Sequence, residues 1–189
     1  MKQARVLTEA ELKRVLAIAG ETRHGARNRM ALMLSHLAGL RVGEIAALTV
    51  RDVIDSEGKV REQIRLAAAI TKGGHARVVF VSERLRREIE RYRKSWEKER
   101  PAKSPLLVTQ KRAAFSANTL CQLMAKLYKD AGLDGATSHS GRRWFITKLA
   151  HSGVSAKVIM TLAGHRNLTT TQRYIDVRDD MMRSAVELL

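Results

Sequence analysis

Disulfide-forming and helix-breaking residues are scarce in this sequence. Among 189 residues there are one cysteine, Cys121, and two prolines, Pro101 and Pro105. A single cysteine excludes an internal disulfide framework and is typical of a reducing compartment. Because both prolines fall in one short stretch, they mark a single loop.

Long apolar runs are also missing. No run approaches the roughly 18 residues that a membrane-spanning helix needs. The first five residues, Met1 to Arg5, lack the apolar core of a signal peptide. We therefore expect a soluble protein that is cytoplasmic or associated with the nucleoid.

The sequence lacks the spacing of metal ligands and of nucleotide-binding loops. Lys72-Gly73-Gly74 does not have the pattern of a Gly-rich phosphate loop. Cys121 stands alone, and the histidines show no close ligand spacing. We therefore expect neither a metal nor another cofactor. The six histidines are His24, His36, His75, His139, His151 and His165.

Apolar residues and positive charge are abundant. Hydrophobic residues make up 44% of the chain, which is enough for the core of a single domain spanning residues 1–189. The 35 Lys and Arg residues outnumber the 19 Asp and Glu residues, for a net charge of +16. Such a balance indicates a polyanionic partner, and DNA, RNA and anionic membrane all remain open.

Hydrophobic periodicity and punctuating residues predict mostly helices around a short β region. Thr8 and Glu11 form a capping box for the first helix, and Gly20 ends it. Three strands with tight links predict a small antiparallel sheet, so the fold class is α+β and mostly helical. The predicted strands are 50–54, 63–70 and 77–81; the other helices are 26–38, 42–48, 82–98, 116–132, 139–151, 155–163, 169–174 and 179–189.

Several polar residues stand out, each with an ordinary structural explanation. Arg41 lies between apolar segments, and spacing alone favours an ion pair with Glu44, three residues on. The alternative is an arginine that faces a phosphate and is held by Glu44. His139 and Arg142 share a helix face, which suits either a solvated helix start or the recognition of phosphate oxygens.

The remaining candidates are equally ambiguous when taken singly. His165 follows Gly164 at a predicted helix end, where a histidine often satisfies carbonyl groups. Tyr174 lies nine residues later, and a lone tyrosine is usually a packing residue. Lys72 lies in a turn and would by default be a solvated hairpin tip.

The whole set is more specific than its members, and it resembles the tyrosine recombinase (phage integrase) family. The order, the spacings and the flanking residues agree with the family from about Leu7 to the end of the chain. The matching segments are Gly39-Leu40-Arg41-Val42-Gly43-Glu44, Thr71-Lys72-Gly73-Gly74, His139-Ser140-Gly141-Arg142, Leu162-Ala163-Gly164-His165 and Thr169-Thr170-Thr171-Gln172-Arg173-Tyr174.

The resemblance implies a set of roles in DNA strand cleavage and rejoining. Tyr174 would attack the phosphorus and form a 3′-phosphotyrosine intermediate, and Lys72 would protonate the leaving 5′ oxygen. Arg41, supported by Glu44, would clamp the phosphate together with Arg142. The histidines His139 and His165 would add hydrogen bonds, and one of them would help take the tyrosine proton. No metal or ATP is implied.

Two departures from the family pattern concern the residues beside the catalytic groups. Ser140-Gly141 stands where many members have an apolar residue before the arginine, and Gly141 is expected to loosen the helix start. Ala163-Gly164-His165 stands where many members have a second glycine or an apolar residue.

The resemblance also implies an assembly. Double-stranded DNA would be the partner, with a tetramer forming on DNA from chains that are monomers in solution. The apolar tail 179–189 would dock on a neighbouring protomer or pack on its own domain. The chain starts where the catalytic domain of the family usually starts, which fits a short natural enzyme or a fragment of a longer one.

Three other functions remain open from the sequence. An inactive DNA-binding module of the same fold would bind DNA without becoming linked to it. A type IB topoisomerase would relax supercoils by related chemistry without pairing two sites. A ribosome-associated or RNA-binding protein would explain the charge but not the ordered set of candidates.

Overall fold

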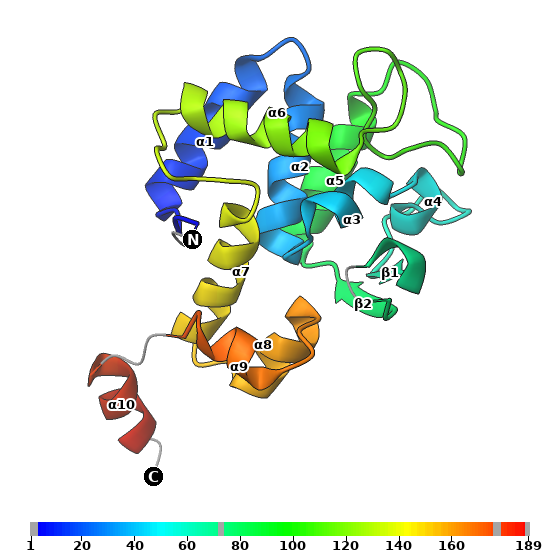
Figure 1. The fold of residues 1–189 in the computed structure, drawn as a ribbon. Helices are drawn as coiled ribbons and strands as arrows, with labels where there is room; N and C mark the ends of the chain where they lie inside the picture. Colours follow the sequence, from blue (N-terminus) through cyan, green and yellow to red (C-terminus); the bar gives the residue numbers. More distant parts are fainter. Residues whose placement is uncertain (1–3, 72–73, 176–178, 188–189) are drawn as a thin grey trace.

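Helices dominate the fold, and a small sheet lies at one edge (Figure 1). The computed structural model describes residues 4–71, 74–175 and 179–187. In chain order the elements are α1 (Glu9–Glu21), α2 (Gly25–Ala38), α3 (Val42–Ala47), α4 (Val50–Val53), β1 (Gln63–Leu66), the 3₁₀ helix η1 (Ala68–Ile70), β2 (Arg77–Phe80), α5 (Glu83–Lys94), α6 (Ala117–Asp130), α7 (Ser140–His151), α8 (Ala156–Ala163), α9 (Leu168–Gln172) and α10 (Asp179–Val186).

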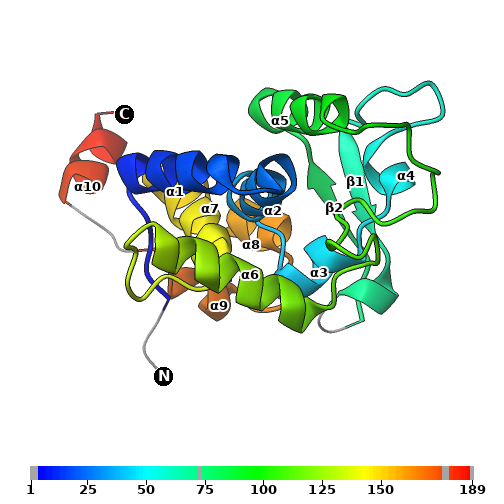
Figure 2. The same cartoon turned by 90° about the horizontal axis from the view of Figure 1, so that it is seen from above.

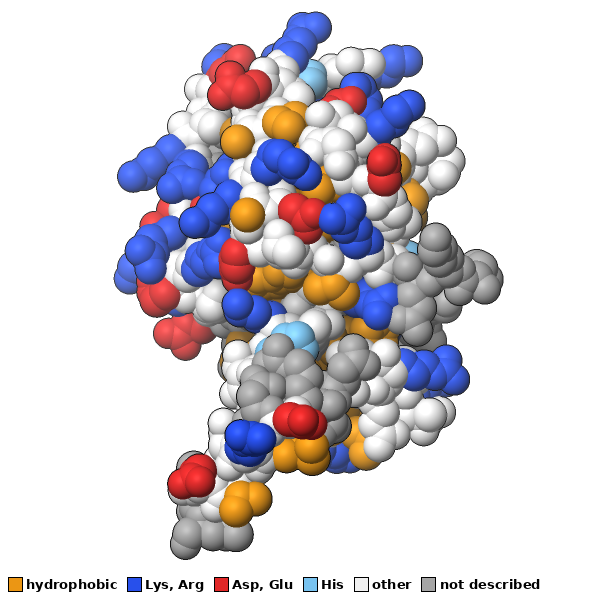
Figure 3. All heavy atoms as spheres, turned by 90° about the vertical axis from the view of Figure 1, so that its left-hand side faces the viewer, with side chains coloured by type: hydrophobic (Ala, Val, Ile, Leu, Met, Phe, Trp, Pro, Cys, Tyr) orange, Lys and Arg blue, Asp and Glu red, His pale blue; other side chains and the backbone are white. Residues whose placement is uncertain are grey.

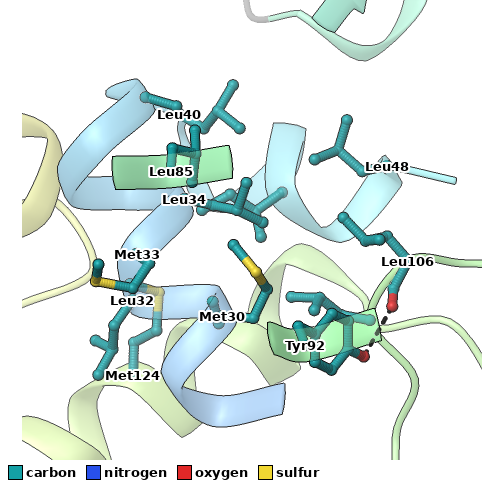
Figure 4. Packing of buried hydrophobic residues seen from close by; sticks show 14 of the residues in the cluster. Met30, Leu32, Met33, Leu34, Leu40, Leu48, Leu85, Tyr92, Leu106 and Met124 are labelled. Atoms are coloured by element: carbon teal, nitrogen blue, oxygen red, sulfur yellow. Dashed lines mark hydrogen bonds between the residues drawn. The ribbon is translucent and has the colours of Figure 1, made fainter. Parts of the chain in front are cut away.

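The main core forms around α2, which packs against α1, α5 and α7 (Figure 2). Helix α1 begins with the predicted capping box, in which the Glu11 N–H donates to Thr8 Oγ1 and the Thr8 N–H donates to Glu11 Oε2. Leucine and methionine side chains of α2 lie buried among residues of α5, α6 and the loops (Figure 4). The Tyr92 hydroxyl, buried in this core, donates to the Leu106 carbonyl at 2.9 Å.

A second, smaller core joins α7, α8 and the segment after α9. It consists of buried Ile146, Ala150, Ile159 and Ala163, with Tyr174 packed at its side. Trp144, two residues before Ile146 on α7, belongs to the main core. Helix α7 therefore connects the two cores, and α8 and α9 lie at its far end (Figure 1).

In the part of the chain that the structure describes, the sheet has two strands, so the prediction of three was wrong. Strands β1 and β2 pair antiparallel, with Ile64 opposite Val79 and Leu66 opposite Arg77. Ile64 and Leu66 alternate with exposed residues, as expected for a sheet with one buried face. The predicted strand 63–70 ends at Leu66, and η1 follows it.

The segment predicted as the first strand, 50–54, forms the short helix α4. The Thr49 N–H and hydroxyl both donate to Asp52 Oδ2, at 2.8 and 2.6 Å. This cap satisfies the start of the turn, and it places Val50 and Val53 on the same buried side. Ile54 alone forms an isolated bridge, with Val60.

The remaining boundaries differ by a few residues. Helix α5 ends at Lys94, four residues before its predicted end, and the Ser95 hydroxyl donates to the Tyr92 carbonyl there. Helix α10 lies apart from the body of the molecule (Figure 1). Among the described residues, every helix is too short or too polar to cross a lipid bilayer.

Candidate active site

Five of the predicted site residues line one cleft. Arg41, His139, Arg142, His165 and Tyr174 come from four separate stretches of the chain, and the cleft that they share has a volume of about 930 Å³. A cleft of this size accepts a ligand larger than a single phosphate. The sixth predicted catalytic residue, Lys72, lies outside the described residues.

Two glycines in the left-handed conformation end helices at the cleft and turn the following residues toward it. Gly39 ends α2 at φ 61°, and Gly164 ends α8 at φ 65°. These are conformations that glycine adopts without strain. Arg41 is the N-terminal cap residue of α3 and lies two residues after Gly39, and His165 follows Gly164 directly. The sharp stop of each helix therefore brings the next residues into the cleft.

Three arginines from different elements converge on the C-terminal end of α8. Arg77 Nη1 donates to the Leu162 carbonyl at 2.9 Å, Arg142 Nη2 donates to the Ala163 carbonyl, and Arg41 Nη2 donates to the Gly164 carbonyl at 3.4 Å. The last carbonyls of a helix lack intrahelical partners and carry partial negative charge. They therefore hold the three guanidinium groups beside one another at the cleft.

Glu44 balances part of this positive charge. Its carboxylate is 1% exposed and lies 3.0 Å from Arg41 Nη1 and 2.6 Å from Arg77 Nη2. Burial raises the pKa of Glu44, but the hydrogen bonds and charges of Arg77 and Arg41 outweigh that effect and lower the pKa overall. Glu44 is therefore ionised at neutral pH and holds both arginines.

Arg142 is the most buried of the cleft arginines, at 6% exposure. Its Nη1 donates to the Gly39 carbonyl at 2.6 Å. Burial, followed by the charges of Arg41 and Arg77, lowers the pKa of Arg142 to about 9. It therefore remains charged at neutral pH, in an environment that an anion in the cleft would make more favourable.

His165 is a neutral histidine fixed by a threonine. Burial, followed by the charge of Arg142 and of the two other arginines, lowers its pKa to about 4. Its Nδ1 lies 2.9 Å from the hydroxyl of Thr171, a fully buried residue of α9. This hydrogen bond fixes the ring orientation and leaves Nε2 as the second hydrogen-bonding atom.

Tyr174 lies against the ring of His165. The two ring centroids are 6.0 Å apart and the planes are inclined by 22°. The Tyr174 N–H donates to the Thr171 carbonyl at 3.0 Å, so Thr171 contacts both the tyrosine backbone and the histidine side chain. The geometry therefore couples the placement of His165 to that of Tyr174.

Tyr174 is also the only one of the chain's three tyrosines that lines this cleft. Tyr92 and Tyr128 are buried in the main core, at 3% and 0% exposure. Burial raises the pKa of both phenols. Neither hydroxyl can reach a substrate without unfolding of the core, so these two residues are excluded as substitute nucleophiles.

Helix α7 starts at the cleft, and its glycine has a packing role. His139 is the N-terminal cap residue of α7, and its side chain is exposed. A Cβ at position 141 would overlap Ser35 Oγ and lie 2.7 Å from His36 Nδ1. Gly141 therefore lets α7 approach α2 closely, and this packing places Arg142. The sequence had instead predicted that Gly141 loosens the helix start.

Sequence reasoning missed three residues of the site: Arg77, Thr171 and Arg143. Arg77 is 9% exposed in its side chain, although it lies on an alternating strand in a highly basic chain. In the sequence, Thr171 is indistinguishable from the two threonines before it, and Arg143 has no feature that sets it apart beside Arg142. In the described residues, no group of three or more His, Cys, Asp and Glu side chains could hold a metal ion.

A mostly helical domain whose cleft combines arginines, histidines and one accessible tyrosine has the construction of a tyrosine recombinase catalytic domain. Residues 5–181 match the phage integrase family, and the chain belongs to this family. It is 36% identical over 185 residues to the tyrosine recombinase XerA of Pyrococcus horikoshii, a match that covers 96% of this chain and 60% of the relative. The chain thus spans about three fifths of the length of that relative.

Solved structures agree on the fold. The crystal structure of XerA recombinase superposes with a TM-score of 0.76 at 24% identity, and the match covers 100% of this chain and 64% of the other. The Tn1549 transposon integrase in complex with transposon right end DNA gives a TM-score of 0.80 at 20% identity, covering 100% and 67%. The chain therefore has the fold of these catalytic domains, with a two-stranded sheet.

Proposed function

We propose that this chain, residues 1–189, acts as a single catalytic domain that cuts and rejoins double-stranded DNA at specific sites. The observation that carries the proposal is the position of Tyr174, an accessible tyrosine beside a cluster of buried and half-buried arginines. Three guanidinium groups held by one helix end form a preorganised site for an anion. The net charge of +16 supports DNA as the polyanion.

Arg41 and Arg142 would bind the scissile phosphate. Displacement at phosphorus adds negative charge to the non-bridging oxygens, and fixed cations stabilise that charge. Two of the five N–H groups of Arg142 are occupied by the carbonyls of Gly39 and Ala163, which fix its orientation and leave the others for the phosphate. Arg77 would act on the phosphate only indirectly, because it shares the carboxylate of Glu44 with Arg41.

The phenolic oxygen of Tyr174 would attack the phosphorus. A bond forms between that oxygen and phosphorus, the bond from phosphorus to the 5′ oxygen breaks, and a 3′-phosphotyrosine link remains. The phenolic proton would pass to a base, for which neutral His165 is suited at neutral pH. Lys72 would donate a proton to the leaving 5′ oxygen, and exposed His139 would add a hydrogen bond to the phosphate.

The assembly that we propose is a tetramer on DNA, formed from chains that are monomers in solution. In α10, Met182 and Val186 are 52% and 66% exposed, and both are apolar. Exposed apolar residues on a helix apart from the body support docking of α10 on a neighbouring protomer. Leu188 and Leu189 lie outside the described residues. The cytoplasm, at the nucleoid, is the location that suits this function.

The test uses nicked duplexes that trap the cleaved strand, made from DNA flanking the gene that encodes this chain. Denaturing gels without metal or ATP would compare the wild type with Tyr174→Phe and Tyr128→Phe. The Tyr128 hydroxyl is buried with no hydrogen-bond partner among the described residues, so Tyr128→Phe is a matched control that should behave as the wild type. We expect a covalent adduct with the wild type and the control, and none with Tyr174→Phe.

The other outcomes distinguish the alternatives. DNA binding without any adduct would indicate the inactive DNA-binding module. Relaxation of supercoiled DNA without exchange between two sites would indicate a topoisomerase. Absence of DNA binding would overturn the proposal and leave the RNA-binding alternative.

A further inference from the structure

Arg143 lies next to Arg142 on α7 but serves a different set of contacts. Its guanidinium carbon is 5.6 Å from the centroid of the Tyr174 ring. Its Nη1 donates to the Ala4 carbonyl at 2.8 Å, and its buried Nε has no hydrogen-bond partner among the described residues. Both Arg143 and Ala4 line the same cleft as Tyr174.

The N-terminal segment is fastened to the body beside this contact. The Arg5 N–H donates to the Gly135 carbonyl at 3.2 Å, and Arg5 Nη1 donates to the Asp134 carbonyl at 3.3 Å. The Arg5 side chain also forms an ion pair with Glu11 at the start of α1. These contacts hold the Ala4 carbonyl where the Arg143 guanidinium reaches it.

The ring of Tyr174 therefore has two partners that come from different parts of the chain. His165 stacks against it from the end of α8, and Arg143 lies over it from α7. Tyr174 is half-buried, follows a five-residue helix and otherwise packs at the side of the second core. A cation over an aromatic face adds attraction without filling the space that the hydroxyl needs.

We propose that Arg143 is a positioning residue that orients the Tyr174 ring toward the phosphate, and that the docked N-terminal segment holds Arg143 in place. This inference rests on the proposed function, because it assigns Arg143 to the cleavage step. Arg143 acts through the tyrosine, whereas Arg41 and Arg142 would act on the phosphate. The N-terminal segment and the nucleophile are then linked through a single side chain.

The test compares Arg143→Met with Arg143→Lys in the full chain. Methionine keeps much of the aliphatic stem and removes the charge, and lysine keeps the charge. The single-turnover rate of adduct formation at saturating nicked duplex, and the Kd for the same duplex, are measured together. We expect Arg143→Met to slow adduct formation about ten-fold, with Kd changed less than about two-fold, and Arg143→Lys to restore most of the rate.

Lys148→Met is the matched control. Lys148 is also on α7, and its Nζ lies 5.9 Å from the centroid of the Trp144 ring and pairs with Glu9, so it too places a cation over an aromatic ring, but away from the cleft. We expect its adduct rate to equal that of the wild type. A slow rate in Lys148→Met as well would overturn the proposal, because it would assign the effect to the stability of α7.

The link to the N-terminal segment is tested by Arg5→Ala. It should slow adduct formation less than Arg143→Met does, and it should add nothing in the double variant. A normal rate for Arg5→Ala would overturn this part of the proposal. An unchanged rate in Arg143→Met, or equal losses of rate and binding that lysine does not restore, would overturn the rest. No adduct from the wild type would instead overturn the proposed function itself.

Discussion

Arg77 Nη2 lies 2.6 Å from Glu44 Oε2, and this buried contact joins the sheet to the start of α3. The other oxygen of Glu44 pairs with Arg41, so one carboxylate bridges two guanidinium groups. The same arginine reaches the Leu162 carbonyl at the end of α8. Arg77 is therefore the side chain that connects β2, α3 and α8 behind the cleft.

Replacing the shared carboxylate should destabilise the fold and the site. Glu44→Gln leaves Arg77, which is 9% exposed in its side chain, and the more exposed Arg41 without their counter-charge, and breaking a buried ion pair such as that of Arg77 costs about 3–5 kcal/mol. Urea unfolding at pH 7 measures the free energy of unfolding. Glu57→Gln is the control, because the exposed pair between Glu57 and Lys59 is worth at most about 1 kcal/mol. Equal losses in the two variants would contradict this account of Glu44.

A methyl group at position 164 should disturb Arg77. A Cβ there would lie 2.5 Å from Arg77 Cδ, and φ is 65°. Gly153 has a similar φ of 75° but nothing within 4 Å of its Cβ position. Gly153→Ala should therefore cost about 1–2 kcal/mol for the left-handed backbone alone. Gly164→Ala should cost more and should also slow adduct formation; a cost no larger than that of Gly153→Ala would show that Arg77 yields freely.

Removal of the Thr171 hydroxyl should affect cleavage more than folding. Thr171→Val keeps the shape of the side chain but takes away the hydrogen bond to His165 Nδ1. We expect adduct formation to fall about ten-fold, because the histidine ring loses the contact that fixes it. Thr161→Val removes an exposed hydroxyl that donates to the Lys157 carbonyl, and its rate should stay normal. A normal rate for Thr171→Val would indicate that His165 is held by its packing alone.

The buried histidine of α2, His36, which faces Trp144 of α7, should make stability depend on pH. Burial lowers the pKa of His36 to about 4, from an ordinary value near 6.5. The unfolded chain therefore binds a proton at a pH where the folded chain does not. Stability is highest above pH 6.5 and falls toward pH 4, by about 3 kcal/mol in all from this group.

Comparison with His36→Met isolates the contribution of His36, because carboxylates and the other histidines titrate in both proteins and cancel in the difference. Urea unfolding at pH 7, 6, 5 and 4.5 should give a stability difference, wild type minus variant, that shrinks steadily as the pH falls. A constant difference would mean that the pKa of His36 is not lowered in the folded protein.

Local signals carried most of the sequence-based prediction. The capping box at Thr8 and the glycine stops at Gly39 and Gly164 depend on neighbouring residues, and the structure has all three. The prediction of a strand at 50–54 was wrong because valines suit both a strand and a short buried helix. The helix is favoured by Asp52, whose carboxylate accepts hydrogen bonds from the cap residue Thr49.

The supports of the site could not be predicted in the same way. Arg77 lies 33 residues from Glu44 along the sequence, and only the fold brings them together. The end of α8 carries no basic residue of its own in its last turn, so nothing in the local sequence shows that three distant arginines satisfy its carbonyls. The sequence suggested that Gly141 weakens the start of its helix. Its role in letting α2 approach closely could not be predicted, because that approach appears only once the helices are packed.

The positive surface is a further feature that composition predicts without locating it. Figure 3 shows Lys and Arg side chains spread over one face of the molecule, with acidic side chains among them. Many of the basic side chains are paired, as Arg29 is with Glu88. Arg41 and Arg77 differ in that they share the single buried carboxylate of Glu44, and Arg142 differs in being buried.

Identification of the amino acid that carries the DNA tests the central claim most directly. The adduct formed on a nicked duplex would be digested with nuclease and trypsin, and the nucleotide remnant located by mass spectrometry. Cleavage after Arg173 and Arg178 isolates Tyr174 in the peptide 174–178. The account predicts a remnant on Tyr174, joined through a 3′ phosphate. A remnant on Tyr92, on Tyr128 or on any other residue, or a link to a 5′ end, would contradict it.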